Sequence, residues 1–245
     1  MPVEPLEHFI KRAKRYDRSS HWINDRALIE KIYELADITS DASVLDVAIG
    51  TGKIAETFYR KARYVVGIDI CLEMVQAAGD IVDSIVFCRG EGLCFKDNTF
   101  DVCVCRQGLQ FMEVPTVLEE MQRVLKPGGR IVSCHLTAYN EKDKETAFLI
   151  QRLRNPARKN FFLPEDLLNA YKAVPFTAIE FFEYISRESV NQWIDNGAIA
   201  VKQMEKIKDI YRTASEDFKR IHHIEFKDGD ILDSMKMLII KGTKR

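Results

Sequence analysis

The chain has 245 residues, 46% of them hydrophobic and 30% charged, which is long enough to bury a large core without disulfides or structural metals. Its 36 lysines and arginines balance 37 aspartates and glutamates, and a net charge of -1 argues against a dedicated nucleic-acid binder. No apolar stretch approaches the ~20 residues of a membrane span, and no spacing of cysteines and histidines predicts a metal site.

The cysteines and the N-terminus favour a cytoplasmic protein. None of the 6 cysteines forms a close Cys-x-x-Cys pair, and most lie in or beside apolar runs, so we expect buried free thiols. Unpaired thiols suit a reducing compartment. Residues 1–17 are charged and lack the apolar segment of a signal peptide, which leads to the same expectation.

The first half of the chain alternates amphipathic segments with short apolar runs. Apolar residues at helical spacing predict helices, and continuous apolar runs bounded by turn residues predict strands. The predicted elements, in chain order, are a helix over 24–36, a strand over 43–47, a helix ending at 62, a strand over 64–69, a helix over 72–78, strands over 85–88 and 100–105, a helix from 115 to about 125, and a strand over 130–134.

The pattern changes after residue 136. The predicted elements there are a polar, basic segment over 137–163, a helix over 164–171, a strand over 178–185, a single long amphipathic helix over about 199–220, and a strand over 235–240. Because most of the strands are apolar nearly throughout, we expect an α/β fold with a doubly wound, mostly parallel, seven-stranded sheet. Residues 1–36 and two insertions, 137–163 and 187–232, would form a helical cap over its carboxyl edge, where ligands bind in such folds.

Two parts of the second half have alternative interpretations. The basic cluster from Arg152 to Lys159, which includes Arg154 and Arg158, is either a solvated loop or an anchor for an acidic or phosphate-bearing substrate. The helix over 199–220 is either a lid or a surface that packs on a partner, and we keep a homodimer as an alternative.

A glycine-bearing loop, Gly50-Thr51-Gly52, follows the first predicted strand. Glycines let the backbone approach a ligand, and the helix after them offers free N–H donors. The run also fits the dinucleotide fingerprint G-x-G-x-x-A, so a nicotinamide or flavin enzyme and a plain turn are alternatives. Asp46, just before the loop, would repel a pyrophosphate but suits an ammonium group, and Asp69 can accept from ribose hydroxyls. This pair favours S-adenosylmethionine over a dinucleotide.

Four segments then carry a specific resemblance, in order from about residue 40 to 136. They are Val44-Leu45-Asp46-Val47-Ala48-Ile49-Gly50-Thr51-Gly52, Val66-Gly67-Ile68-Asp69-Ile70-Cys71-Leu72-Glu73-Met74, Gly92-Leu93-Cys94-Phe95-Lys96-Asp97-Asn98-Thr99-Phe100-Asp101 and Arg123-Val124-Leu125-Lys126-Pro127-Gly128-Gly129-Arg130. They resemble the successive motifs of class I S-adenosylmethionine-dependent methyltransferases, and most closely the small-molecule branch typified by the ubiquinone/menaquinone C-methyltransferases. The resemblance implies a Rossmann-like fold and one methyltransferase domain over 1–245, with its cofactor core over 40–136 and lid helices over 1–36.

The resemblance also implies the residues that hold the cofactor. By position these are Tyr16, Asp46, Ala48, Gly50, Gly52, Asp69, Ile70, Met74, Gly90, Glu91 and Arg106. In the family the residue at Arg89 is usually acidic, so either Gly90 contacts the adenine through its backbone or Glu91 takes the acidic role. Ala48 stands where many members have glycine. Tyr16 matches a tyrosine that closes over the cofactor, and we expect residues 1–22 to be mobile until it binds.

The sequence identifies no catalytic base. Methyl transfer from a sulfonium depends mainly on positioning, and a base is needed only where the nucleophile must lose a proton. Gln110 stands near the position where many members have histidine. His21 and His135 are the candidates, and an ordinary structural histidine is the alternative for each. We therefore expect methyl transfer to a small-molecule acceptor. A protein or peptide methyltransferase and a non-catalytic cofactor-binding protein are the alternatives.

Overall fold

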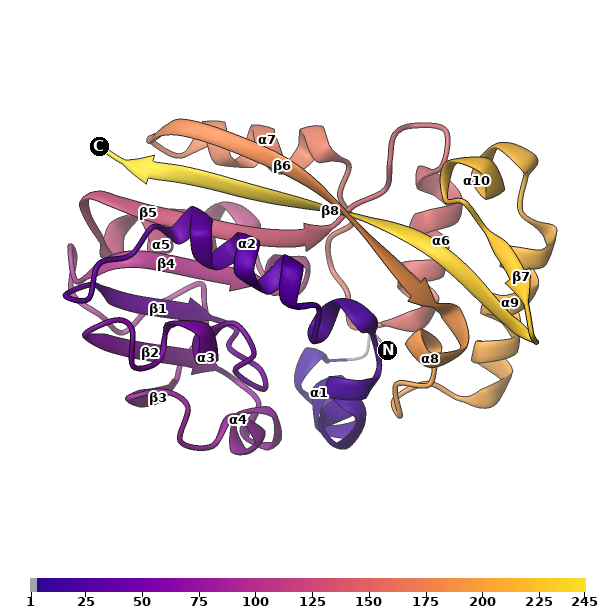
Figure 1. The fold of residues 1–245 in the computed structure, drawn as a ribbon, viewed down its shortest axis with the longest axis horizontal. Coiled ribbons are helices and arrows are strands. Elements are labelled where there is room, and N and C mark those ends of the chain that lie inside the picture. Colours follow the sequence, from indigo (N-terminus) through magenta and orange to yellow (C-terminus); the bar gives the residue numbers. More distant parts are fainter. Residues whose placement is uncertain (1–3) are drawn as a thin grey trace.

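The computed structural model describes residues 4–245, and it contains one sheet with helices on both faces (Figure 1). Seven strands follow the order β3-β2-β1-β4-β5-β8-β6, and β7 pairs with β8 beside this path. The strands are β1 (Ser43–Val47), β2 (Tyr64–Asp69), β3 (Ser84–Phe87), β4 (Phe100–Arg106), β5 (Leu125–Leu136), β6 (Phe176–Ser189), β7 (Glu225–Lys227) and β8 (Asp230–Lys244). From β3 to β5 the neighbours are parallel, and β8 is antiparallel to β5 and β6. The expected mostly parallel α/β sheet is confirmed.

The helices lie between and beyond these strands. The α-helices are α1 (Pro5–Arg12), α2 (Arg26–Ala36), α3 (Ala55–Phe58), α4 (Leu72–Ala78), α5 (Val114–Val124), α6 (Lys144–Arg154), α7 (Pro164–Ala173), α8 (Val190–Ile194), α9 (Val201–Thr213) and α10 (Glu216–Ile221). Three short 3-10 helices are η1 (Ala13–Arg18), η2 (His21–Ile23) and η3 (Leu109–Phe111).

The sheet is apolar on both sides because successive strand residues point to opposite faces. In β4, Val102 and Val104 pack into a core shared with α2 and α3. Cys103 and Cys105 of the same strand pack into a second core shared with α5 and α7. Two buried faces explain why most of the strands read as continuous apolar runs.

The second half differs from two sequence predictions. β6 and β8 extend beyond the other strands, and α6, α8, α9 and α10 gather around this extension (Figure 1). The polar segment 137–163 contains α6, which the sequence pattern did not predict. The prediction of a single long helix over 199–220 is also wrong, because the helix breaks between α9 and α10. There the hydroxyl of Ser215 accepts the Phe218 N–H and caps the start of α10. In residues 4–245, no helix combines the length and the apolarity needed to cross a membrane.

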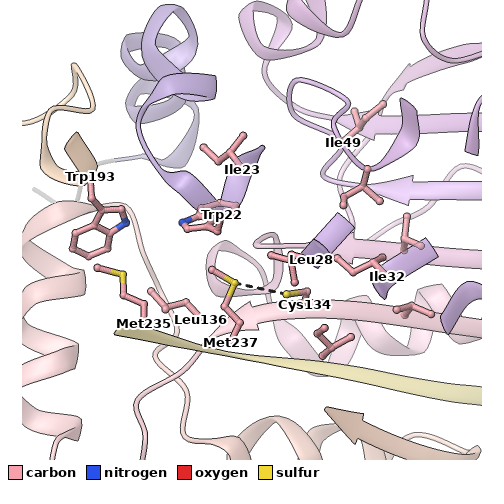
Figure 2. Packing of buried hydrophobic residues seen from close by; sticks show 14 of the residues in the cluster. Trp22, Ile23, Leu28, Ile32, Ile49, Cys134, Leu136, Trp193, Met235 and Met237 are labelled. Atoms are coloured by element: carbon pink, nitrogen blue, oxygen red, sulfur yellow. Dashed lines mark hydrogen bonds between the residues drawn. The ribbon is translucent and has the colours of Figure 1, made fainter. Parts of the chain in front are cut away.

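The N-terminal segment is anchored in the core through η2. Trp22 and Ile23 are buried beside β5 and β8, where Figure 2 shows them near Met237, whose sulfur lies 3.9 Å from the Cys134 thiol. The carboxylate of Glu188 in β6 accepts the backbone N–H groups of His21 and Trp22 at 2.8 and 3.0 Å. This anchoring was not expected for residues 1–22, and it limits any lid motion to the part of the segment before η2.

A buried charge cluster joins α10 to the strands. His222, which follows α10, places Nδ1 2.9 Å from Asp233 Oδ1 and Nε2 3.0 Å from Asp143 Oδ2. Both ring nitrogens therefore face acceptors, which requires both to carry a proton. Burial alone would lower the pKa of His222, but the hydrogen bonds to the two carboxylates outweigh it and raise the pKa to about 9. The Tyr211 hydroxyl donates to the other oxygen of Asp233 at 2.6 Å.

Candidate functional site

The main cavity opens at the carboxyl ends of β1, β2, β3 and β4. It has a volume of about 380 Å³, within the usual range of small-molecule sites. The strand order runs from β1 to β2 and β3 on one side and from β4 to β5 on the other, so the chain switches direction between β1 and β4. In open α/β sheets, ligands bind at the carboxyl ends of the strands beside such a switch point. Of the residues predicted to hold a cofactor, those on its wall are Tyr16, Ala48, Gly50, Asp69, Ile70, Met74, Gly90, Glu91 and Arg106.

Asp69 ends β2 with its carboxylate held in one orientation. Oδ2 accepts the Gly50 N–H at 2.9 Å, and Oδ1 accepts those of Ile70 and Cys71 at 2.8 and 2.9 Å. Burial raises the pKa of this carboxyl, although the three backbone donors favour its ionised form. A fixed, partly buried carboxylate at the end of a strand is suited to accept hydrogen bonds from a diol.

Apolar and backbone groups complete the wall on this side. Ile70, Met74 and Phe87 provide an apolar surface next to Asp69. The cavity wall also includes Arg89, Gly90 and Glu91. Contact of the adenine with the Gly90 backbone and contact with the Glu91 carboxylate therefore both fit this wall. The Glu91 carboxylate also accepts the Glu113 N–H at 3.1 Å, which fixes one of its oxygens.

Asp46 and Gly52 are not on the cavity wall. Asp46 is 2% exposed, and its Oδ2 has no hydrogen-bond partner among the residues described. Burial raises the pKa of Asp46 to about 7, and the charge of Arg106 opposes this rise. The Arg106 guanidinium lines the cavity and donates to the carbonyls of Trp22 and Ile23, both at 3.2 Å. A positive charge on a bound ligand would favour the ionised form of Asp46, as Arg106 does.

Gly52, which the resemblance places at the cofactor, also packs closely against its neighbours. Its φ of +77° is in the left-handed region, and a Cβ there would lie 2.5 Å from Ile81 Cδ1. The side chains of the α4–β3 segment thus occupy the space that a larger residue would need. Gly50, by contrast, lines the cavity with φ +56°, and its Cβ would meet Met74 Cε at an ordinary 3.4 Å.

We expect Gly52→Ala to lower the free energy of unfolding by roughly 1–3 kcal/mol, since it combines backbone strain with a clash. Gly229→Ala is the matched control, because Gly229 has the same φ of +77° and nothing within 4 Å of its Cβ position. Urea unfolding should show the larger loss for Gly52→Ala. Equal losses would mean that Ile81 moves aside freely and that packing does not require this glycine.

The N-terminal segment forms part of the cavity wall. Pro5, Leu6 and Phe9 of α1 line it together with Tyr16 of η1. The Phe9 ring meets Phe111 edge-on, with centroids 4.9 Å apart. The sequence pattern did not single out Phe9, because α1 carries no motif that marks a residue of a cavity wall. Gln107, also on the wall, follows β4 with φ +58°.

Neither candidate base lies on the wall. The His21 side chain is largely exposed and lies near Asp25, with Nδ1 3.7 Å from its carboxylate. His135 is fully buried, and burial lowers its pKa to about 3. Its Nδ1 lies 3.3 Å from Gln110 Oε1, and Gln110 in turn donates to Gln107. His135 therefore reaches the cavity only through two glutamines, neither of which can take a proton.

Comparisons with known proteins agree with this geometry. The family described as methyltransferase domain matches residues 45–133. An uncharacterized protein of Methanocaldococcus jannaschii is 30% identical over 190 residues, covering 74% of this chain and 86% of the relative. Demethylmenaquinone methyltransferase of Streptomyces avermitilis is 31% identical over 166 residues, covering 64% and 72% of the two chains. The chain belongs to the S-adenosylmethionine-dependent methyltransferases.

A comparison with solved structures shows that the fold is shared. The crystal structure of YcgJ from Bacillus subtilis superposes with a TM-score of 0.82 at 22% identity, covering 89% of this chain and 97% of that chain. The predicted family, the enzymatic activity and S-adenosylmethionine as cofactor are thereby confirmed. The nicotinamide or flavin alternative is not supported for this methyltransferase.

Proposed function

We propose that this methyltransferase transfers the methyl group of S-adenosylmethionine to a small-molecule acceptor by in-line displacement. The observation that carries the proposal is the covered cavity, whose outer wall is formed by Phe9 and Tyr16 of the N-terminal segment. A protein substrate would have to displace this segment, whereas a small molecule fits beneath it. The similarity to demethylmenaquinone methyltransferase agrees with a small acceptor.

The residues present suit the cofactor. Asp69 would accept from the ribose hydroxyls, and Ile70 and Met74 would contact the adenine. The Arg106 guanidinium would face the carboxylate of the methionine moiety, and the negative charge of Asp46 would favour its ammonium group. S-adenosylmethionine supplies a methyl group on a sulfonium, whose thioether leaves readily.

The role of the protein in this reaction is to hold the methyl donor and the acceptor in line and to exclude water from them. Holding donor and acceptor in line can account for roughly 7–11 kcal/mol of a barrier, so an enzyme of this type can work without a strong base. Phe9, Phe111 and Tyr16 are aromatic side chains of the cavity wall, and with a ligand bound they would exclude water from it. We propose that residues 4–18 act as a lid, hinged at η2, which Trp22 and Ile23 hold in the core.

The test is a transfer assay with radiolabelled S-adenosylmethionine and a cell extract separated by size. We expect label in the small-molecule fraction, and none when the enzyme carries Asp69→Ala. Label in protein would support the peptide alternative. Binding of S-adenosylhomocysteine without transfer to any fraction would support a non-catalytic protein.

A further inference from the structure

Two buried arginines, Arg12 and Arg154, and a half-buried one, Arg158, line a second, smaller cavity beside the main one, which we call the arginine cavity. Its volume is about 30 Å³. Arg12 comes from α1, Arg154 from the last turn of α6, and Arg158 from the loop that follows α6. Arg12 and Arg154 are 3% and 6% exposed. Trp22 and Trp193, both visible in Figure 2, form part of the remaining wall.

None of these three arginines forms an ion pair within residues 4–245. Surface arginines such as Arg15 and Arg123 do pair with carboxylates. Arg154 Nε donates to the Trp193 carbonyl at 3.0 Å, and Arg158 Nε donates to the Asn160 carbonyl at 2.9 Å. Arg12 lies over the rings of Phe9 and Tyr16, and its buried Nε has no hydrogen-bond partner in the described chain.

The buried carboxylate that acts on Arg154 is already engaged. Glu188 favours the charge of Arg154 electrostatically. Its oxygens, however, accept the backbone N–H groups of His21 and Trp22 and the Ser186 hydroxyl. Glu188 therefore fixes η2 to β6 and does not neutralise the arginine cavity.

Unpaired buried cations are costly, and three facing one space also repel each other. Burial lowers the pKa of Arg12, Arg154 and Arg158, that of Arg158 to about 9. An oxyanion in the cavity would relieve both costs, because guanidinium groups bind carboxylates and phosphates through paired hydrogen bonds.

The arginine cavity adjoins the main cavity on its lid side. Phe9, Tyr16, Gln107 and Phe111 line both. One molecule could therefore place a charged end among the arginines and its remaining atoms in the main cavity. The residues proposed to contact the adenine, Ile70 and Met74, line the main cavity and do not line the arginine cavity.

We propose that the methyl acceptor carries a small oxyanion, a carboxylate or a phosphate, and that Arg12, Arg154 and Arg158 bind it in the arginine cavity. This inference rests on the proposed function for the identity of the ligand as acceptor. Arg12 belongs to the lid, so a bound anion would also hold α1 closed over the cavity. Binding of a charged acceptor would thus favour the closed position of α1.

The test uses calorimetric titration with sodium acetate and with inorganic phosphate at constant ionic strength, with and without saturating S-adenosylhomocysteine. The two titrations distinguish a carboxylate from a phosphate. We expect at least one anion to bind, and Arg12→Met to weaken it by about tenfold or more, as loss of a charge-assisted contact predicts. Arg152→Met is the matched control, because Arg152 is exposed on α6 with its guanidinium 4.9 Å from the Phe161 ring centroid.

A second readout separates an anion site from a structural role. Without added anion, Arg12→Met should have a Tm equal to or above that of the unmodified protein, because it removes an uncompensated buried charge. A lowered Tm would indicate that Arg12 stabilises the fold, and would overturn the inference. Failure of both anions to bind, or equal binding to Arg12→Met, would also overturn it. S-adenosylhomocysteine binding, measured in the same samples, tests the proposed function separately.

Discussion

Asp69→Ala is expected to weaken the binding of S-adenosylhomocysteine by at least about tenfold, because hydrogen bonds to a charged group contribute roughly 1.5–3 kcal/mol. The carboxylate is held by the N–H groups of Gly50, Ile70 and Cys71, so it meets a ligand already oriented. Its removal takes away the acceptor for the ribose and also releases the glycine loop. Isothermal titration calorimetry measures the affinity, and circular dichroism checks the fold.

Asp101→Ala provides the control for loss of a structural aspartate. Asp101 lies near the amino end of β4, away from the cavity, and accepts the Ser43 N–H at 2.8 Å and the Lys126 ammonium at 2.7 Å. We expect this variant to lose stability while keeping its affinity for S-adenosylhomocysteine. Unchanged affinity in Asp69→Ala would instead refute the assignment of the ribose contact.

His222→Ala is expected to lower the free energy of unfolding by about 3–5 kcal/mol near neutral pH, as for removal of one partner from a buried ion pair. It would leave the carboxylates of Asp143 and Asp233 buried without their cation. The same histidine makes stability depend on pH. Its pKa rises from 6.5 to about 9 on folding, so the charged ring stabilises the fold fully below pH 6.5.

This contribution, roughly 3 kcal/mol, should be lost as the pH rises from 6.5 to about 9. Urea unfolding at several pH values should show the decline in the unmodified protein and its absence in His222→Ala. His223→Asn is the control, since His223 is exposed and asparagine tolerates its φ of +47°. A flat profile over this range in the unmodified protein would contradict a charged His222.

The N-terminal segment links the cofactor site to the proposed anion site. Tyr16 and Phe9 line both cavities, and Arg12 lies over both of their rings. We therefore expect an anion in the arginine cavity to change the affinity for S-adenosylhomocysteine.

Local sequence patterns determined every strand except β7, most of the helices on the sheet, and the residues at the carboxyl ends of β1 and β2. The place of Asp69 in the cavity could be predicted because it is the last residue of a strand. The place of Gly50 could be predicted because it lies in the loop after a strand, where its positive φ favours glycine. The break after α9 was missed because the helical spacing of apolar residues continues across it, while Ser215 starts a new helix.

Tertiary structure alone decided which distant groups meet. Arg12 and Arg154 share a cavity although they lie far apart in the chain, and His222 contacts both Asp233 of β8 and Asp143, which precedes α6. It also placed Gly52 against Ile81, and placed His135 behind Gln110 and off the cavity wall. Such contacts depend on the path of the whole chain. The repeat of two residues in strands and of 3.6 residues in helices predicts local structure and says nothing about which distant residues meet.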